Sequence, residues 1–162
     1  MATATTHTAA VTLPADDQIL ITRAFDAPAA DVFKVWTTPA LVRRWWHARR
    51  GEMTVCEIDL RVGGRWRYAM IARGMEVAFH GEYREIVVNE RIVHTELYEG
   101  APDHPALTTV TFDEIDGRTT VTLLVQHASR QARDMHVQSG MEDGLQDALD
   151  LLELEAIALA DG

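Results

Sequence analysis

Residues 130–160 read RQARDMHVQSGMEDGLQDALDLLELEAIALA, and this stretch decides the fold. It contains no proline, and from Met141 onward its apolar side chains recur at helical spacing, within a stripe of roughly 100 degrees. Ser129 is a suitable N-cap, and Asp161 and Gly162 end the pattern. The sequence therefore predicts one long C-terminal helix whose apolar face lies on another element.

Two glycines, Gly140 and Gly144, lie four residues apart on the flank of this stripe. A glycine inside a helix costs about 1 kcal/mol relative to alanine. Two of them on one face indicate either close approach of another backbone or space left beside the helix. Plain packing and a ligand channel both remain open at this point.

The residues before this helix are predicted to form mainly β-strands. Residues 18–25 alternate, with Ile19, Ile21 and Arg23 on one face. Two short helices follow, the first opening near Pro28 and the second ending near Trp45 and Trp46. The next predicted strands are 53–60, 65–71, 76–88, 91–99, 107–112 and 119–126, with turns at Gly63-Gly64, Asn89-Glu90 and Asp116-Gly117.

This order, β-α-α followed by five or six antiparallel strands and a helix, predicts an α+β fold. A curved antiparallel sheet wraps around the C-terminal helix, which alone is long enough to cover the apolar face of the sheet. A sheet curled in this way encloses a cavity more readily than a flat sandwich does. We expect one domain over residues 17–162, preceded by a disordered leader over residues 1–16.

Composition narrows the class of protein. A chain of 162 residues can bury roughly 70% of its unfolded surface without a disulfide or a metal. The lone Cys56 cannot form an intramolecular disulfide, which favours a reducing, cytoplasmic location. The net charge of −10 disfavours nucleic acid and anionic membranes as partners. No apolar run approaches the roughly 18 residues of a transmembrane helix.

The hairpin around Asn89-Glu90 carries the candidate chemistry. A two-residue turn would place Glu85 opposite His94 and Tyr83 opposite Glu96. The face that holds these residues is the one richer in aromatics, so we expect it to point inward. Glu85 and His94, helped by Tyr83, would then form an acid/base couple.

Two alternatives to that couple stay open. Glu85 and His94 could simply satisfy each other near an open rim, because buried ionisable groups need partners. A bulge at Gly81 could instead turn the register outward.

A cavity between the sheet and the last helix would be lined mostly by apolar side chains. Apolar walls with a few polar groups suit a hydrophobic or aromatic small molecule. The expected ligand-binding residues are Trp66, Tyr68, Met70, Phe79, Tyr83, His94, Met141 and Leu145.

Other kinds of site lack support. The chain contains no HExxH, no cysteine pair, no nucleophile elbow and no Walker loop, so neither a metal nor a cofactor is expected. The basic-aromatic run over residues 43–50 is interpreted as tryptophans that pack inward beside solvated arginines. Leu151, Leu154 and Ile157 lie off the main helical stripe and are either exposed or covered by a second copy in a homodimer.

Several local strings, taken in order, resemble a known group. The chain is similar to the START-like, Bet v 1-like (SRPBCC) superfamily with the helix-grip fold, and within it to the branch named for the activator of Hsp90 ATPase, the AHSA1-like domain. The strings that carry this resemblance are ITRAFDAP at 21–28, TPAL at 38–41, WW at 45–46, DLRVGGRW at 59–66, FHGEY at 79–83, ERIV at 90–93, and the residues from Gly140 to Leu152. The resemblance extends over about residues 18 to 160.

The resemblance implies a fold more than a mechanism. Members of the superfamily bind lipid-like or aromatic ligands, act as polyketide cyclase-like enzymes or serve as co-chaperones, and no universal catalytic residue can be transferred. Two departures stand out: His47-Ala48 where many relatives have Gly-Pro, and Gly144-Leu145 where many have Gly-Trp. The second would enlarge the pocket or alter its lining, which leaves the identity of the ligand open. Three readings follow, namely a binder of a hydrophobic small molecule, a polyketide cyclase-like enzyme using Glu85 and His94, and a chaperone-interaction module.

Overall fold

The computed structural model describes residues 7–162, so the first six residues of the expected leader lie outside the described part of the chain. Eight strands form one antiparallel sheet in the order β1-β2-β8-β7-β6-β5-β4-β3. The strands are β1 Ala10–Thr12, β2 Gln18–Phe25, β3 Glu52–Ile58, β4 Arg65–Ala72, β5 Met75–Val87, β6 Arg91–Tyr98, β7 Ala106–Ile115 and β8 Arg118–His127. The helices are α1 Ala29–Thr37, α2 Pro39–Val42, α3 Arg130–Gln138 and α4 Met141–Asp161.

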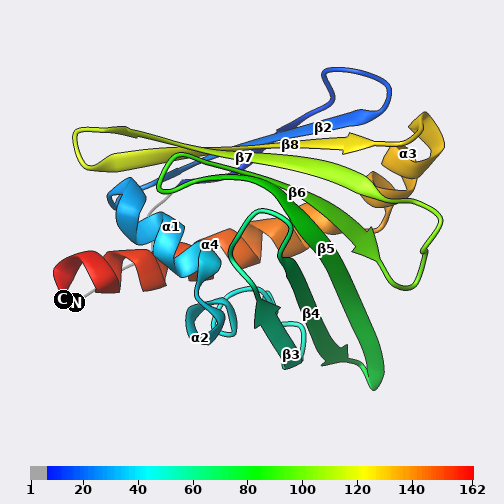
Figure 1. The fold of residues 1–162 in the computed structure, drawn as a ribbon, viewed down its shortest axis with the longest axis horizontal. Coiled ribbons are helices and arrows are strands. Elements are labelled where there is room, and N and C mark those ends of the chain that lie inside the picture. The colour runs from blue at the N-terminus through cyan, green and yellow to red at the C-terminus, as the bar shows by residue number, and fades with distance from the viewer. Residues whose placement is uncertain (1–6) are drawn as a thin grey trace.

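The sheet is strongly curved, and α4 runs beneath its concave face (Figure 1). Helix α1 packs against α4, so the two short helices close the space at one end of the sheet. This is the predicted α+β helix-grip fold.

Strand β2 shows how the sequence pattern becomes the core. Its alternation buries Ile19, Ile21 and Arg23 on the concave face. Arg23 is accommodated there because its guanidinium donates to two carboxylates of α4, at 3.0 Å to Glu153 and 2.7 Å to Asp150. An arginine in β2 therefore fixes the position of the last helix.

The C-terminal stretch forms two helices, so the prediction of one continuous helix over residues 130–160 is wrong at Ser139 and Gly140. Ser129 caps α3 as expected, accepting the backbone N–H of Ala132 at 3.1 Å. The chain then turns at Gly140, whose φ of +83° lies in the left-handed region that ends a helix. Gly144 lies inside α4, where an added Cβ would meet only the Arg50 guanidinium at 3.9 Å.

Residues 7–16 lie against the sheet and α4, which corrects that part of the expected disordered leader. Ala10–Thr12 form β1, which pairs with β2 at the edge of the sheet. The side-chain amide of Gln146 on α4 both accepts from the Ala9 N–H at 2.9 Å and donates to the Ala9 carbonyl at 2.8 Å. Backbone pairing on one side and an amide clamp on the other hold this segment.

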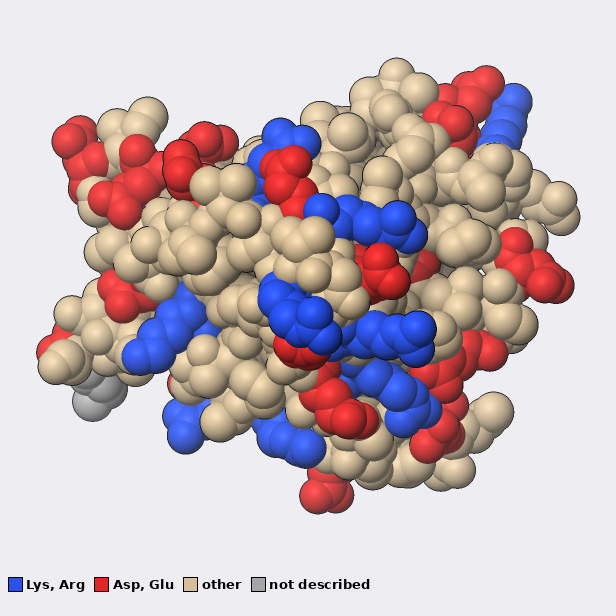
Figure 2. Space-filling model, in the orientation of Figure 1, with Lys and Arg blue, Asp and Glu red and all other residues tan. Residues whose placement is uncertain are grey.

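The basic-aromatic run behaves as expected, although α2 ends at Val42 and turns continue to residue 49. Trp45 is buried and donates its indole N–H to the Val35 carbonyl at 3.0 Å, whereas Arg43 and Arg44 stay exposed. On the face of the molecule that is turned toward the viewer in Figure 2, arginine and lysine side chains are interspersed with acidic ones near the middle. Within residues 7–162, no helix combines the length and the hydropathy needed to cross a membrane.

Candidate functional site

The β5–β6 hairpin has a different register from the predicted one. Tyr83 faces His94, and Glu85 faces Val93, with a register shift between Tyr83 and Glu85. The connection spans residues 88–90 rather than two residues, and Asn89 adopts a φ of +65°. A bulge at Arg84, not at Gly81, therefore separates the two halves of β5.

This bulge removes the predicted acid/base couple. An extra residue in one strand reverses the faces beyond it, so Glu85 lies on the outer face. Its carboxylate is 2.7 Å from Nε of Arg91 across the hairpin, and 48% of its side chain is exposed. Glu85 and His94 therefore do not pair. The acid/base couple predicted from the sequence is wrong, because Glu85 is not the carboxyl group on the face of His94.

The predicted aromatic residues do share the concave face. Ring centroids are 4.8 Å apart for Trp66 and Tyr68, 5.4 Å for Trp66 and His94, and 6.3 Å for Tyr83 and His94. Trp46, which follows α2, packs edge-on against Tyr68 at 5.4 Å. The strands thus supply a continuous aromatic surface.

The remaining expected lining residues lie around this surface. Phe79 lies opposite Tyr68 and Met70 opposite Met53, so both point the same way as Tyr68. Met141 and Leu145, in the first turns of α4, are half-buried and pack against the core. Apart from Glu85, the residues expected to form the site therefore belong to the concave side of the sheet or to α4.

Three polar side chains on this face are withdrawn from water. Tyr68, His94 and Glu96 each keep some accessible surface. Yet burial raises the pKa of Tyr68 well above its usual range, lowers the pKa of His94, and raises the pKa of Glu96 to about 7. These shifts mean that surrounding protein, rather than open solvent, sets the environment of all three groups.

The hydrogen bond of His94 defines its tautomer. Its Nδ1 is 3.1 Å from the carbonyl oxygen of Thr95, which can only accept, so Nδ1 carries the proton. Because burial favours the neutral ring, Nε2 is left unprotonated and acts as a hydrogen-bond acceptor.

Two further polar groups adjoin His94 and were not assigned a role from the sequence. Glu96 comes two residues later on the same face, and it makes no hydrogen bond or ion pair with any residue from 7 to 162. Thr108 of β7 lies directly opposite His94, and its hydroxyl is buried with no partner in the same range. Thr108 could not be found from the sequence, because its face depends on the register between β6 and β7.

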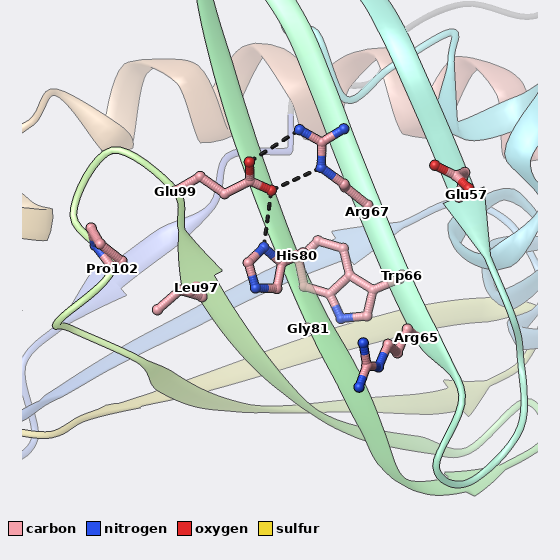
Figure 3. A pocket seen from close by; sticks show the side chains of 9 residues that line it. All are labelled: Glu57, Arg65, Trp66, Arg67, His80, Gly81, Leu97, Glu99 and Pro102. Carbon is pink, nitrogen blue, oxygen red and sulfur yellow. Dashed lines mark hydrogen bonds and ion pairs between the residues drawn. The ribbon is translucent and has the colours of Figure 1, made fainter.

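The outer face carries a pocket of about 580 Å³ that is open to solvent (Figure 3). The Glu99 carboxylate there accepts two bonds from Arg67, at 2.9 and 3.0 Å, and one contact of 2.9 Å from His80 Nδ1. The bonds from Arg67, then from His80, lower the pKa of Glu99 to about 2. The charge of the Glu99 carboxylate is thus balanced by Arg67. This network lies on the opposite side of the sheet from the predicted site.

One cluster has the residue types of a metal site. Ligand atoms of His7, Asp26 and Glu153 lie within 4.8 Å of one another. However, Glu153 already binds Arg23 and the Asp26 N–H, and Arg118 lies 3.4 Å from the Asp26 carboxylate. Two guanidinium groups beside the cluster oppose a cation, so we assign no metal there.

The fold and the concave face together define a helix-grip domain with an aromatic inner surface and a few withdrawn polar groups. Residues 26–156 match the model of the family described as activator of Hsp90 ATPase homolog 1-like protein. The chain belongs to this family, within the START-like, Bet v 1-like superfamily. Family and fold indicate a ligand-binding or activator-type module in general terms.

Solved structures agree with this assignment. A protein from Rhodobacter sphaeroides is 25% identical, with a TM-score of 0.85 over 93% of this chain and 99% of its own. One from Chromobacterium violaceum is 25% identical, with a TM-score of 0.76 over 91% and 99%. An AHSA1-like protein from Aeromonas hydrophila, 21% identical over 86% of this chain and 93% of its own, shares the fold with a TM-score of 0.67. No curated protein matches the sequence.

Proposed function

We propose that the protein binds a hydrophobic or aromatic small molecule in a recess between the concave face of the sheet and α4. The observation that carries this proposal is the state of Tyr68, His94 and Glu96. Each retains accessible surface on the inner face, yet burial shifts the pKa of each. Polar groups that keep accessible surface while protein surrounds them favour a narrow recess on this face over an open exterior.

The surroundings suit an apolar guest. Trp46 packs against Tyr68 and Phe79, and Trp66 packs against Tyr68, so flat aromatic surfaces border the polar groups. Such surfaces favour aromatic partners through stacked and edge-on contacts. By the resemblance, Leu145 stands where many relatives have tryptophan, and its smaller side chain would enlarge the recess or alter its lining.

The other two readings have less support. The cyclase-like reading relied on Glu85, which is paired with Arg91 on the outer face. The chaperone reading rests on the family description alone, and no surface of the described residues favours it. The cytoplasmic location, which was inferred from the lone Cys56, stays a prediction, and Cys56 is buried. The homodimer also stays a prediction, and Leu151, one of the residues that suggested it, packs against the core of its own chain.

A neutral fluorescent probe, N-phenyl-1-naphthylamine, tests the proposal. We expect saturable binding with one site per chain, and Leu145→Trp should weaken it about tenfold or more by filling the recess. The matched control is Leu107→Trp, which adds the same indole at an exposed position of β7 and should leave affinity unchanged. Absence of saturable binding, or equal effects of both substitutions, would contradict the proposal.

A further inference from the structure

The polar groups of the concave face are gathered at one place. His94 and Glu96 project from the same side of β6, and Thr108 lies across from His94 on β7. His94 is wedged between aromatic rings, 5.4 Å from Trp66 and 6.3 Å from Tyr83. This polar end of the recess is therefore bounded by the aromatic surface described above.

These groups offer complementary hydrogen bonds that the protein does not use. Nε2 of His94 can accept, because Nδ1 already donates to the Thr95 carbonyl. The carboxyl of Glu96 keeps some accessible surface and makes no hydrogen bond within residues 7–162. The hydroxyl of Thr108 is buried and has no partner in the same range. Buried polar atoms without partners are costly, so a guest that supplies partners gains affinity.

The charge around these groups argues against an anionic guest. At the concave-face positions of the strands within residues 7–162, Arg23 is the one lysine or arginine. It is fully buried and already held by Glu153 and Asp150. The described strands therefore offer no free cation to neutralise a carboxylate or a phosphate. Of the arginines that approach from the turns after α2, Arg43 donates to the Met53 carbonyl and Arg50 pairs with Asp147.

We propose that His94, Glu96 and Thr108 select an uncharged aromatic ligand that carries a ketone or similar oxygen acceptor, with the Glu96 carboxyl donating its proton to that oxygen in a hydrogen bond. A hydroxyl elsewhere on the ligand would donate to Nε2 of His94. This inference rests on the proposed function, since it names the class of ligand for the same recess.

The protonation of Glu96 makes the inference testable by pH. Only the protonated carboxyl donates, and burial raises its pKa to about 7. The other titratable groups turned toward the recess are Cys56 of β3, Tyr68 of β4, Tyr83 of β5, His94 of β6, His127 of β8 and His136 of α3. Burial raises the pKa of the thiol and of both phenols and lowers the pKa of the three imidazoles. Between about pH 6.5 and 8.5, ionisation of Glu96 therefore dominates the pH dependence of ligand binding.

Calorimetric titration with a matched pair of probes separates the hydrogen bond from apolar contact. At about pH 6.5, 2-acetylnaphthalene should bind roughly five- to tenfold more tightly than 2-ethylnaphthalene, which has the same shape without the oxygen. At about pH 8.5 this preference should vanish. Glu96→Gln should keep the preference at both pH values, because an amide N–H donates regardless of pH, and Glu96→Leu should abolish it at both.

The control variant is Glu82→Gln, since Glu82 pairs with Arg84 at the exposed side of β5 and should leave every affinity unchanged. Binding of 2-ethylnaphthalene with no preference for the ketone at either pH would overturn this inference and leave the proposed function standing. Failure of both probes to bind would overturn both. A third probe, 2-naphthoate, should bind more weakly than the ketone, and tighter binding of that anion would also contradict the inference.

Discussion

The guanidinium of Arg23 and the carboxylate of Glu153 lie 3.0 Å apart, and both side chains are fully buried between β2 and α4. We expect Glu153→Leu to cost about 3 kcal/mol or more in the free energy of unfolding, because it leaves a buried charge short of its partner. Denaturant titration measures this cost. The control is Glu155→Gln, whose partner Arg44 is 62% exposed, and it should cost less than about 1 kcal/mol.

A second variant keeps this prediction specific to charge. Replacing both partners, Arg23→Met with Glu153→Leu, should recover part of the loss, because two apolar groups need no partner. A double variant that is less stable than Glu153→Leu alone would show that shape, rather than charge pairing, dominates at this contact.

Glu96 should make the protein less stable as the pH rises. Burial raises its folded-state pKa from 4.5 to about 7. Between these values the unfolded chain has lost a proton that the folded protein retains, so the free energy of unfolding falls with increasing pH. The shift corresponds to at most about 3 kcal/mol.

Glu96→Gln should therefore exceed the wild type in stability at about pH 8 and match it at about pH 3, where the carboxyl is protonated in both the folded and the unfolded state. Urea titrations at the two pH values compare the proteins, and Glu85→Gln on the outer face should lack this effect. Equal stability of Glu96→Gln and the wild type at about pH 8 would indicate that the carboxyl is solvated.

The imidazoles of His127 and His136 should make the protein less stable as the pH falls, the opposite of the effect of Glu96. Their nitrogens Nε2 and Nδ1 are 3.0 Å apart, and burial, together with the neighbouring imidazole, lowers the pKa of His136 to about 4. Below the usual histidine pKa of about 6.5, His136 is protonated in the unfolded chain but stays neutral in the folded protein. The free energy of unfolding therefore falls as the pH decreases from about 6.5 toward 4. His136→Gln should reduce this loss by about 2 kcal/mol.

Thermal unfolding between about pH 7 and 4.5 measures the slope of that loss. His47→Gln, in the turn after α2, should keep the wild-type slope. An unchanged slope in His136→Gln would mean that other groups cause the acid sensitivity.

The two glycines of the C-terminal region should respond in opposite ways to alanine. Gly140 has a φ of +83°, so Gly140→Ala should destabilise the protein by about 1 to 2 kcal/mol. Gly144 lies inside α4 with open space beside it, so Gly144→Ala should stabilise it by up to about 1 kcal/mol. Thermal unfolding distinguishes them, and a loss of stability in both would mean that Gly144 also serves close packing.

Much of the fold could be predicted because its signals are local. Alternation in β2 and the turn residues Asp116-Gly117 depend on neighbours in sequence, and the structure confirms the strand and the hairpin. The break at Gly140 was missed because no proline marks it and Gly140 was interpreted as a glycine on the flank of one helix, not as the residue that ends α3.

The site was harder to predict because it depends on register. A single extra residue at Arg84 moves Glu85 from the inner to the outer face, and no turn or composition signal marks that bulge. The strand beyond the turn was less affected: His94 and Glu96 keep the inward face that the pattern predicts. The alternation in β6 thus located the candidate polar groups, although the sequence pointed to a different acid.

The most direct test of the account is to observe which methionine methyl groups lie near a bound ligand. Nuclear Overhauser effects from 2-acetylnaphthalene to methyl-labelled protein give this contact map, since the methionines within residues 7–162 differ in location and exposure. The account predicts contacts to Met70 and Met141, on the inner face and on α4. Contacts confined to the exposed Met75 and Met135, or none at all, would contradict it.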